Sequence, residues 1–138
     1  MTANINPYLN FDGQASEALD FYTSALGGEV EGVMRWKDMP GQEVPPQLAD
    51  NIMHACLKVG DGRIMLSDLP PHMKVAAGNQ AHVMLELTEP DDVDRIFAAL
   101  SEGGEVKMPV ENTFWNARYG HLIDRFGVSW MLNCSLGG

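Results

Sequence analysis

Apolar residues recur at helical spacing in two segments of the chain. In the first segment these positions are Ala15, Ala18, Leu19, Tyr22 and Leu26. In the second they are Val93, Ile96, Phe97 and Leu100. Because residues three and four apart share a helical face, both segments are predicted to form amphipathic helices. A Gly-Gly pair follows each segment, and glycine readily adopts the left-handed conformation that ends a helix.

A short alternating segment precedes each predicted helix, over residues 6–11 and 82–87. Both segments are predicted to be strands, because alternate side chains of a strand point to opposite faces of the sheet. One set of positions is apolar and should pack under the helix: Pro7, Leu9, Phe11, Val83, Leu85 and Leu87. The other set is mixed and should face the opposite way: Asn6, Tyr8, Asn10, His82, Met84 and Glu86.

Further strands are predicted after each helix. They cover about 29–37, 52–59 and 63–67 in the first half, and 105–110, 118–124 and 128–134 in the second. Gly60-Asp61-Gly62 and Arg125-Phe126-Gly127 are expected to be turns between neighbouring strands. The proline-containing stretches 38–50 and 69–80 are predicted to be loops, and the second of them links the two halves.

The two halves are an internal repeat. Gly27-Gly28-Glu29-Val30 returns as Gly103-Gly104-Glu105-Val106, 76 residues later, and Phe21 matches Phe97 at the same offset. The sequence therefore predicts an α+β fold of two β-α-β-β-β modules within a single domain over residues 1–138. The first module covers about 1–69 and the second about 80–138.

Composition narrows the range of partners. The chain has 138 residues, of which 45% are hydrophobic, and this is enough for one core. Its formal net charge of −10 disfavours nucleic acid and anionic lipid as partners. Residues 1–7 are polar, and the sequence has no apolar run of the roughly 20 residues that a membrane helix needs. Cys56 and Cys134 are too few for a disulfide framework, so we expect a cytoplasmic protein.

Short motifs along nearly the whole chain resemble a known family. They are Asn6-Pro7-Tyr8-Leu9, Glu17-Ala18 with Phe21-Tyr22, Ile52-Met53-His54-Ala55, Met65-Leu66-Ser67-Asp68, Thr113-Phe114-Trp115 and Asp124-Arg125-Phe126-Gly127 with Trp130. The sequence resembles the vicinal-oxygen-chelate (glyoxalase/bleomycin resistance/dioxygenase) superfamily, and within it the PhnB-like branch, also labelled 3-demethylubiquinone methyltransferase-like. The resemblance implies curved mixed sheets around a cavity, and a homodimer.

Many members of this superfamily hold a divalent metal ion with four His or Glu side chains. The resemblance carries these positions over to Asn6, Met65, His82 and Met131, of which only His82 is a ligand of the usual type. We therefore expect no metal site and no cofactor here. The alternative is a divalent ion bound through His82, with Glu86 and further ligands from elsewhere.

The resemblance places the mixed strand positions toward the cavity. The predicted ligand-binding residues are Tyr8, His54, Met65, Ser67, His82, Met84, Glu86, Trp115, Tyr119 and Met131. His54 is either a half-buried, hydrogen-bonded histidine or a pocket residue near Asp68, and Glu86 is either a desolvated acid–base group or a solvated carboxylate at the rim. Trp115 either closes over a planar ligand or covers the core or the dimer interface. Trp130 is predicted to pack in the core.

Two hypotheses about function follow. The first is a dimeric protein that binds a small apolar or planar molecule without a metal, in a pocket that contains adaptable methionines. The second is a lyase, isomerase or dioxygenase that uses a divalent ion, or His82 and Glu86 as the acid–base residues. The chain has no G-x-G-x-x-G motif between a strand and a helix, so the methyltransferase label has no support from a nucleotide-binding motif.

Overall fold

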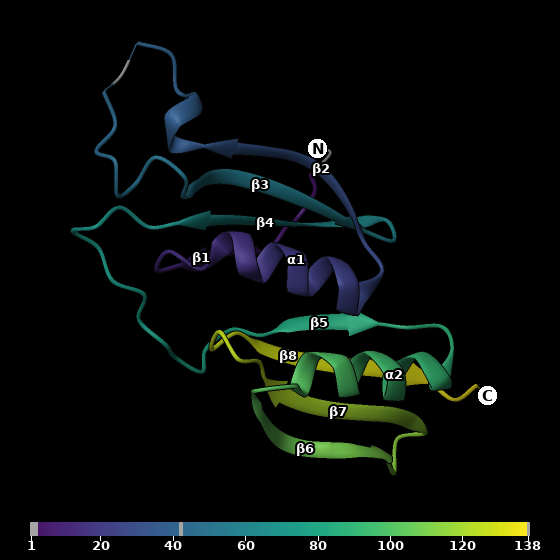
Figure 1. The fold of residues 1–138 in the computed structure, drawn as a ribbon. Coiled ribbons are helices and arrows are strands. Elements are labelled where there is room, and N and C mark those ends of the chain that lie inside the picture. The colour runs from purple at the N-terminus through teal and green to yellow at the C-terminus, as the bar shows by residue number, and fades with distance from the viewer. Residues whose placement is uncertain (1–2, 42, 138) are drawn as a thin grey trace. The chain divides into compact units, whose positions relative to one another are not determined.

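The computed structural model describes residues 3–41 and 43–137, which form two compact units divided between Ala76 and Ala77. The first unit contains β1 (Tyr8–Phe11), α1 (Ala15–Leu26), β2 (Glu29–Arg35), the 3-10 turn η1 (Trp36–Asp38), β3 (Ile52–Val59) and β4 (Gly62–Asp68). The second contains β5 (Val83–Glu86), α2 (Pro90–Ser101), β6 (Glu105–Asn112), β7 (Ala117–Ile123) and β8 (Ser129–Ser135) (Figure 1). Neither helix is long and apolar enough to cross a membrane in the part of the chain described.

Each unit is one mixed four-stranded sheet with one helix. The strand orders are β1-β4-β3-β2 and β5-β8-β7-β6. In both sheets the first two strands of that order are parallel and the other pairs are antiparallel. The predicted α+β fold of two β-α-β-β-β modules is thus confirmed. The division falls within the stretch 69–80 that was predicted to link the modules, while a single domain over 1–138 stays a prediction.

Several element boundaries differ from the sequence prediction. The opening strands are shorter, because β1 begins at Tyr8 and β5 at Val83. Strand β2 ends at Arg35, where the chain enters η1. Strand β6 continues through Pro109 to Asn112, with a register irregularity between Met108 and Glu111. An edge strand can contain a proline because one side of its backbone needs no partner strand.

The repeated Gly-Gly pairs have two separate roles. Gly27 and Gly103 have φ of +68° and +76°, the left-handed conformation in which the chain leaves the helix. The second glycine of each pair lies against a neighbouring strand. A Cβ atom at Gly28 would lie 2.8 Å from the carbonyl oxygen of Lys58, and one at Gly104 would collide with the backbone of Ile123. The repeat therefore conserves both the helix ending and the close approach of the next strand.

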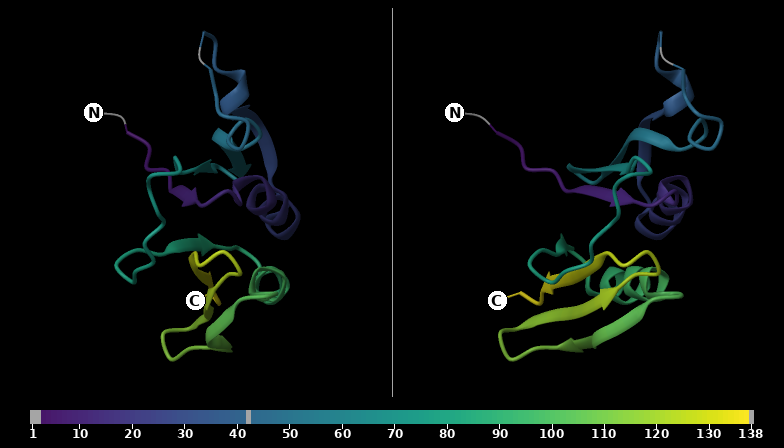
Figure 2. Two further views of the ribbon diagram at one scale, coloured as in Figure 1. Left: turned by 60° about the vertical axis from the view of Figure 1, so that its left-hand side comes forward. Right: turned by 90° about the vertical axis from the view of Figure 1, so that its left-hand side faces the viewer.

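Each helix lies across one face of its own sheet and buries the predicted apolar stripe (Figure 2). In the first unit the Phe11 and Tyr22 rings have centroids 6.4 Å apart. In the second unit Trp130 is fully buried, which confirms its predicted place in the core. Phe97 of α2 packs directly on Gly120, where a Cβ atom would lie 2.7 Å from the ring. One face of each sheet is thus covered by its helix, and the other is left open.

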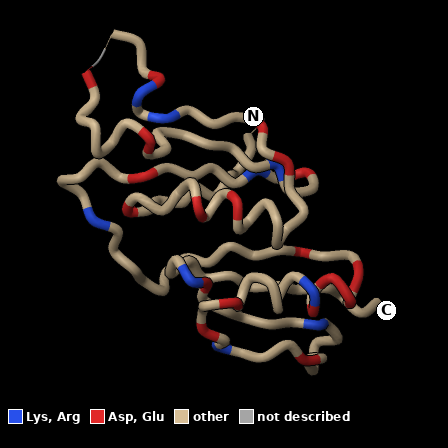
Figure 3. Tube along the Cα trace, in the orientation of Figure 1, with Lys and Arg blue, Asp and Glu red and all other residues tan. Residues whose placement is uncertain are grey.

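Acidic residues outnumber basic residues along both units (Figure 3). One group of them lies at the start of α2, where Pro90 occupies the first helical turn with Asp91 and Asp92. The positive end of the helix dipole stabilises carboxylates at this place. This part of the negative charge therefore contributes to helix stability.

Asp68, at the end of β4, is one of two buried carboxylates that fix the backbone. It is 2% exposed and accepts 2.9 Å hydrogen bonds from the backbone N–H groups of Ala15 and Ile52. The first donor is at the N-terminus of α1 and the second is the first residue of β3. One side chain thus joins three elements of the first unit.

Asp124, at the turn between β7 and β8, is the buried carboxylate that fixes the backbone of the second unit. It is 3% exposed and accepts hydrogen bonds from the backbone N–H groups of Phe126 and Val128, at 2.9 and 3.0 Å. Its second oxygen accepts a 2.8 Å bond from the indole N–H of Trp130. The carboxylate therefore shapes the turn and orients the largest core side chain.

Replacing Asp124 by Asn should destabilise the protein. An amide at this place presents an N–H₂ group to one of the three donors and loses the charge, so the expected decrease in the free energy of unfolding is about 2 to 3 kcal/mol. Urea denaturation followed by tryptophan fluorescence measures the decrease. The control is Asp61→Asn in the exposed β3–β4 turn, which should change stability by less than about 0.5 kcal/mol. Equal effects of the two substitutions would show that the buried hydrogen bonds contribute little.

Candidate functional site

The open face of the first sheet carries two cross-strand rows of side chains. In one row Tyr8, Met65 and Cys56 are direct partners on β1, β4 and β3. In the next row Asn10 pairs with Ser67, and His54 pairs with Met34. We call this the first open face, made of Tyr8, Asn10, Glu31, Met34, His54, Cys56, Arg63, Met65 and Ser67.

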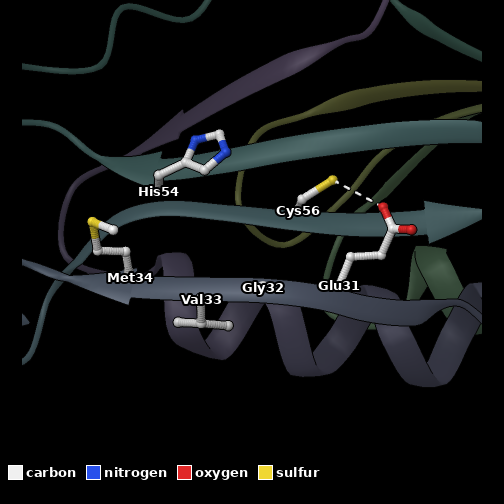
Figure 4. A pocket seen from close by; sticks show the side chains of 6 residues that line it. All are labelled: Glu31, Gly32, Val33, Met34, His54 and Cys56. Atoms are coloured by element: carbon white, nitrogen blue, oxygen red, sulfur yellow. Dashed lines mark hydrogen bonds between the residues drawn. The ribbon is translucent and has the colours of Figure 1, made fainter.

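A pocket of about 360 Å³ lies on this face, above β2 and β3 (Figure 4). Its lining residues are Glu31, Gly32, Val33, Met34, His54 and Cys56. The side chains of Met34, His54 and Cys56 rise on the same side of the two strands, and the Glu31 carboxylate turns toward Cys56 (Figure 4). An irregularity in the strand register between Val30 and Gly32 lets Glu31 reach this side. The pocket therefore has apolar walls and one carboxylate at its end.

An ion pair sets the charge at this end of the pocket. The Arg63 guanidinium donates to both Glu31 oxygens, at 2.6 and 3.1 Å. This hydrogen bonding lowers the pKa of the Glu31 carboxyl, so the group stays ionised at neutral pH. The Cys56 sulfur lies 3.6 Å from Glu31, and burial together with this carboxylate raises the pKa of the thiol. Cys56 is thus a neutral thiol, and the charge of Glu31 is matched by Arg63.

Tyr8 and His54 form the main polar contact elsewhere on the first open face. The Tyr8 hydroxyl lies 3.3 Å from His54 Nδ1, and the ring centroids are 5.8 Å apart. His54 is exposed, whereas both Asp68 oxygens accept buried backbone N–H groups. The structure therefore pairs His54 with Tyr8 and does not form the His54–Asp68 pair considered from the sequence. Ser67 is buried, and its hydroxyl lies 3.3 Å from the Asn10 side-chain oxygen.

The open face of the second sheet has three rows. The first pairs His82 with Ser129 through their side chains. The second crosses all four strands, as Met84, Met131, His121 and Met108. The third also crosses all four strands, as Glu86, Asn133, Tyr119 and Glu111. We call these residues together the second open face.

Two histidines on this face share one hydroxyl group. Ser129 Oγ lies 2.5 Å from His82 Nδ1 and 2.8 Å from His121 Nε2, and the two imidazole rings meet edge to face with centroids 5.0 Å apart. Burial lowers the pKa of His121, and electrostatic interactions with His82 and Lys107 lower it further. His121 is therefore a neutral imidazole at neutral pH.

The remaining predicted site residues lie at the edge of this face. Glu86 accepts hydrogen bonds from the Asn133 amide at 3.1 and 3.2 Å, whereas His82 is hydrogen-bonded to Ser129. The two candidate acid–base residues therefore have different hydrogen-bond partners. Trp115 lies in the turn between β6 and β7, is 51% exposed and contacts the Tyr119 ring at 5.8 Å between centroids. Phe114 beside it is 97% exposed.

Sequence reasoning missed several residues of the two open faces. Glu31, Met34 and Arg63 were not selected, because the ion pair joins strands that are distant in the sequence. His121 and Met108 were not selected either, because only the strand register shows that they continue the row of Met131. The alternation of β7 could have identified His121, since it has the same phase as Tyr119.

The four positions to which the resemblance carried the family's metal ligands, Asn6, Met65, His82 and Met131, do not fit a hard divalent ion. They offer one amide, two thioethers and one imidazole, and that imidazole is hydrogen-bonded to Ser129. Hard and borderline divalent ions prefer carboxylate oxygen and several imidazole nitrogens. Among the described residues no group of three or more His, Cys, Asp or Glu side chains converges in a way that could hold a metal.

The chain belongs to the Glyoxalase/Bleomycin resistance protein/Dioxygenase superfamily, whose family model matches residues 4–132. Within it the chain is PhnB-like. Protein YjdN of Escherichia coli (strain K12) is 31% identical over 94% of this chain and 93% of YjdN. Protein PA1353 from Pseudomonas aeruginosa is 40% identical, with a TM-score of 0.87 over 97% of this chain and 98% of that one. The PhnB protein from Bacillus cereus is 25% identical, with a TM-score of 0.78 over 96% of this chain and 100% of that one.

The lowered pKa of His121 predicts a specific pH dependence of stability. As the pH falls, His121 of the unfolded chain takes up a proton before His121 of the folded chain, so protons favour unfolding. The contribution of neutral His121 to the free energy of unfolding is fully present above the pKa of the histidine in the unfolded chain. It is lost as the pH falls through the lower pKa of the histidine in the folded chain. Urea denaturation between pH 7.5 and 4.5 should therefore show a steeper loss of stability for the wild type than for His121→Gln. Parallel curves would contradict the prediction, and NMR titration of the ring protons gives the pKa directly.

Proposed function

We propose that the protein binds a small apolar or planar molecule on the open faces of its sheets, without the divalent ion used by many relatives. The exposure of large apolar side chains carries this proposal. Tyr8, Met34, Met84 and Met108 are between 43% and 48% exposed, although they lie within strands. Several large apolar groups on the open face of a sheet are typical of a binding surface.

The arrangement of polar groups also supports a small-molecule site. Ligand pockets are usually apolar with a few fixed polar groups that orient the ligand. On the first open face these groups are the Tyr8–His54 pair and the Glu31–Arg63 ion pair, at two ends of an apolar strip. Methionine side chains are flexible and polarisable, so Met34 and Met65 can adapt to a flat ligand. The expectation of a cavity enclosed by both sheets stays a prediction.

Binding can be measured with the neutral planar dye Nile red. Its fluorescence should rise on addition of the protein, and Met34→Lys should weaken binding at least about tenfold, because burial of a methionine side chain contributes about 1.5 to 3 kcal/mol. The matched control is Met73→Lys. Met73 is 48% exposed but lies in the loop after β4, so this substitution should change the affinity less than twofold.

A chelator distinguishes the two hypotheses about function. Protein treated with EDTA should bind the dye as tightly as untreated protein. Dye binding that disappears with EDTA and returns with a stoichiometric divalent ion would overturn the metal-free proposal. Equal loss of binding in Met34→Lys and Met73→Lys would show that the dye does not report on the first open face.

We also propose that the protein is a homodimer. The edge strands β2 and β6 are exposed along nearly their whole length and include the large apolar residues Val30, Val33, Val106 and Met108, each at least 40% exposed. Edge strands of this kind are usually covered or paired in soluble proteins. The contact area of a second copy would remove these side chains from water.

Sedimentation equilibrium at micromolar concentration tests this proposal. The expected mass is twice the 15.2 kDa of one chain. A double substitution, Val33→Glu with Val106→Glu, places charges on both edges and should shift the protein toward the single-chain mass. The control is Val75→Glu, at an equally exposed position in the loop after β4. A single-chain mass for the wild type would overturn the dimer.

A further inference from the structure

The second open face gathers sulfur and nitrogen donors in one place. Met84, Met131, His121 and Met108 are direct cross-strand partners in a row over β5, β8, β7 and β6. Met131 and His121 are partners in an antiparallel pair, in which Cβ atoms lie about 4.5 to 5.5 Å apart. Met84 is the parallel partner of Met131, and neighbouring strands lie about 4.8 Å apart. Methionine has three rotatable side-chain bonds, so the thioethers of Met84 and Met131 can turn toward one point. The row therefore brings two sulfur atoms within reach of an imidazole.

The shared hydroxyl group orients the imidazoles for ligation. Ser129 lies within hydrogen-bond distance of one nitrogen of each ring, so its hydroxyl donates to one ring and accepts from the other. When both rings are neutral, the ring that donates its N–H to Ser129 has its lone pair on the opposite nitrogen. A hydrogen bond of this kind is the usual support behind a metal-bound histidine, because it fixes the tautomer and the ring orientation.

The donor types select the metal. Thioether sulfur is a soft ligand that favours Cu(I), and imidazole also binds copper. The neighbouring row contains two carboxylates, Glu86 and Glu111, and Glu86 is hydrogen-bonded to Asn133. Mg²⁺ and Mn²⁺ prefer oxygen ligands, and Zn²⁺ prefers thiolate, imidazole or carboxylate. Two thioethers and one imidazole are therefore a poor set for these ions and a better one for a soft monovalent ion.

We propose that the second open face binds Cu(I) through the thioethers of Met84 and Met131 and the imidazole of His121. Ser129 is the positioning residue that holds the rings. All of these residues lie in the second unit. The site therefore differs from the family's divalent site, which takes ligands from both modules. The proposal adds a metal ligand to the proposed binding of a small molecule and does not depend on that binding.

The first test is a competition for Cu(I). Protein is titrated under argon, with ascorbate present, into the coloured Cu(I) complex of bicinchoninate. The wild type should remove one Cu(I) per chain, and Met131→Leu and His121→Gln should each weaken the affinity at least tenfold. Leu has nearly the volume of Met, so this substitution leaves the fold in place. The matched control is Met73→Leu, because Met73 is as exposed as Met84 but lies in the loop after β4.

The second test locates the ion. In protein labelled with ¹³C at the methionine methyl groups, Cu(I) should shift the signals of Met84 and Met131 and leave those of Met34 and Met73 in place. Ser129→Ala should weaken the Cu(I) affinity less than Met131→Leu and should leave the free energy of unfolding nearly unchanged, whereas a purely structural role would lower the stability and leave the affinity of the folded protein in place.

Three results would overturn the proposal. The first is no removal of Cu(I) from bicinchoninate. The second is evidence that Met131 is not a ligand, which is either an unchanged affinity in Met131→Leu or methyl shifts at Met34 and Met65 in place of Met84 and Met131. The third is a tighter, stoichiometric site for Zn²⁺ or Ni²⁺ that is lost in His82→Ala, which would indicate a divalent site of the family type. Nile red binding is measured on the same variants, so a failure of the copper site is distinguishable from a failure of small-molecule binding.

Discussion

Two buried carboxylates determine where the backbone of each unit can go. Burial of an ionised side chain is unfavourable unless hydrogen bonds replace its water, and Asp68 and Asp124 obtain those bonds mainly from backbone N–H groups. Asp68 fixes the start of α1 against the end of β4, while Asp124 fixes the turn that leads into β8 and holds the indole of Trp130. Asp68 thus attaches α1 to its sheet, whereas Asp124 positions the largest core side chain of the second unit. In both units the helix covers one face of the sheet and leaves the other open.

The open faces are a consequence of the core. A slip of one residue in strand register would turn Trp130 and Leu132 toward solvent and bring Met131 into the core. The helix-covered face therefore fixes the register of β8 with β5 and β7, and this register alone decides that Met84, Met131 and His121 are neighbours. The side chains that we propose as ligands are therefore positioned by core residues on the opposite face of the strand.

Much of the fold could be predicted because its signals are local. The helical spacing of apolar residues and the Gly-Gly endings are visible within a few positions, and alternation in β1 and β5 correctly separated the core side from the open side. Contacts between strands that are distant in the sequence could not be predicted in this way. The Glu31–Arg63 ion pair spans 32 residues, and the pairing of His54 with Tyr8 in place of Asp68 depends on which face each strand end presents. The extension of β6 beyond Pro109 depends on its place at the edge of a sheet.

The internal repeat shows which positions are free to change. Met65 and Met131 are equivalent central residues, each between an opening strand and an antiparallel neighbour. Around Met65 the flanking residues are Tyr8 and Cys56, whereas around Met131 they are Met84 and His121. The helix-covered positions are apolar in both copies, because each must fill a core. The flanking positions of the open faces are not constrained in this way. One scaffold can therefore present a tyrosine–histidine pair beside a thiol in one unit and a set of soft donors in the other, and the two faces can differ in ligand chemistry without any change in topology.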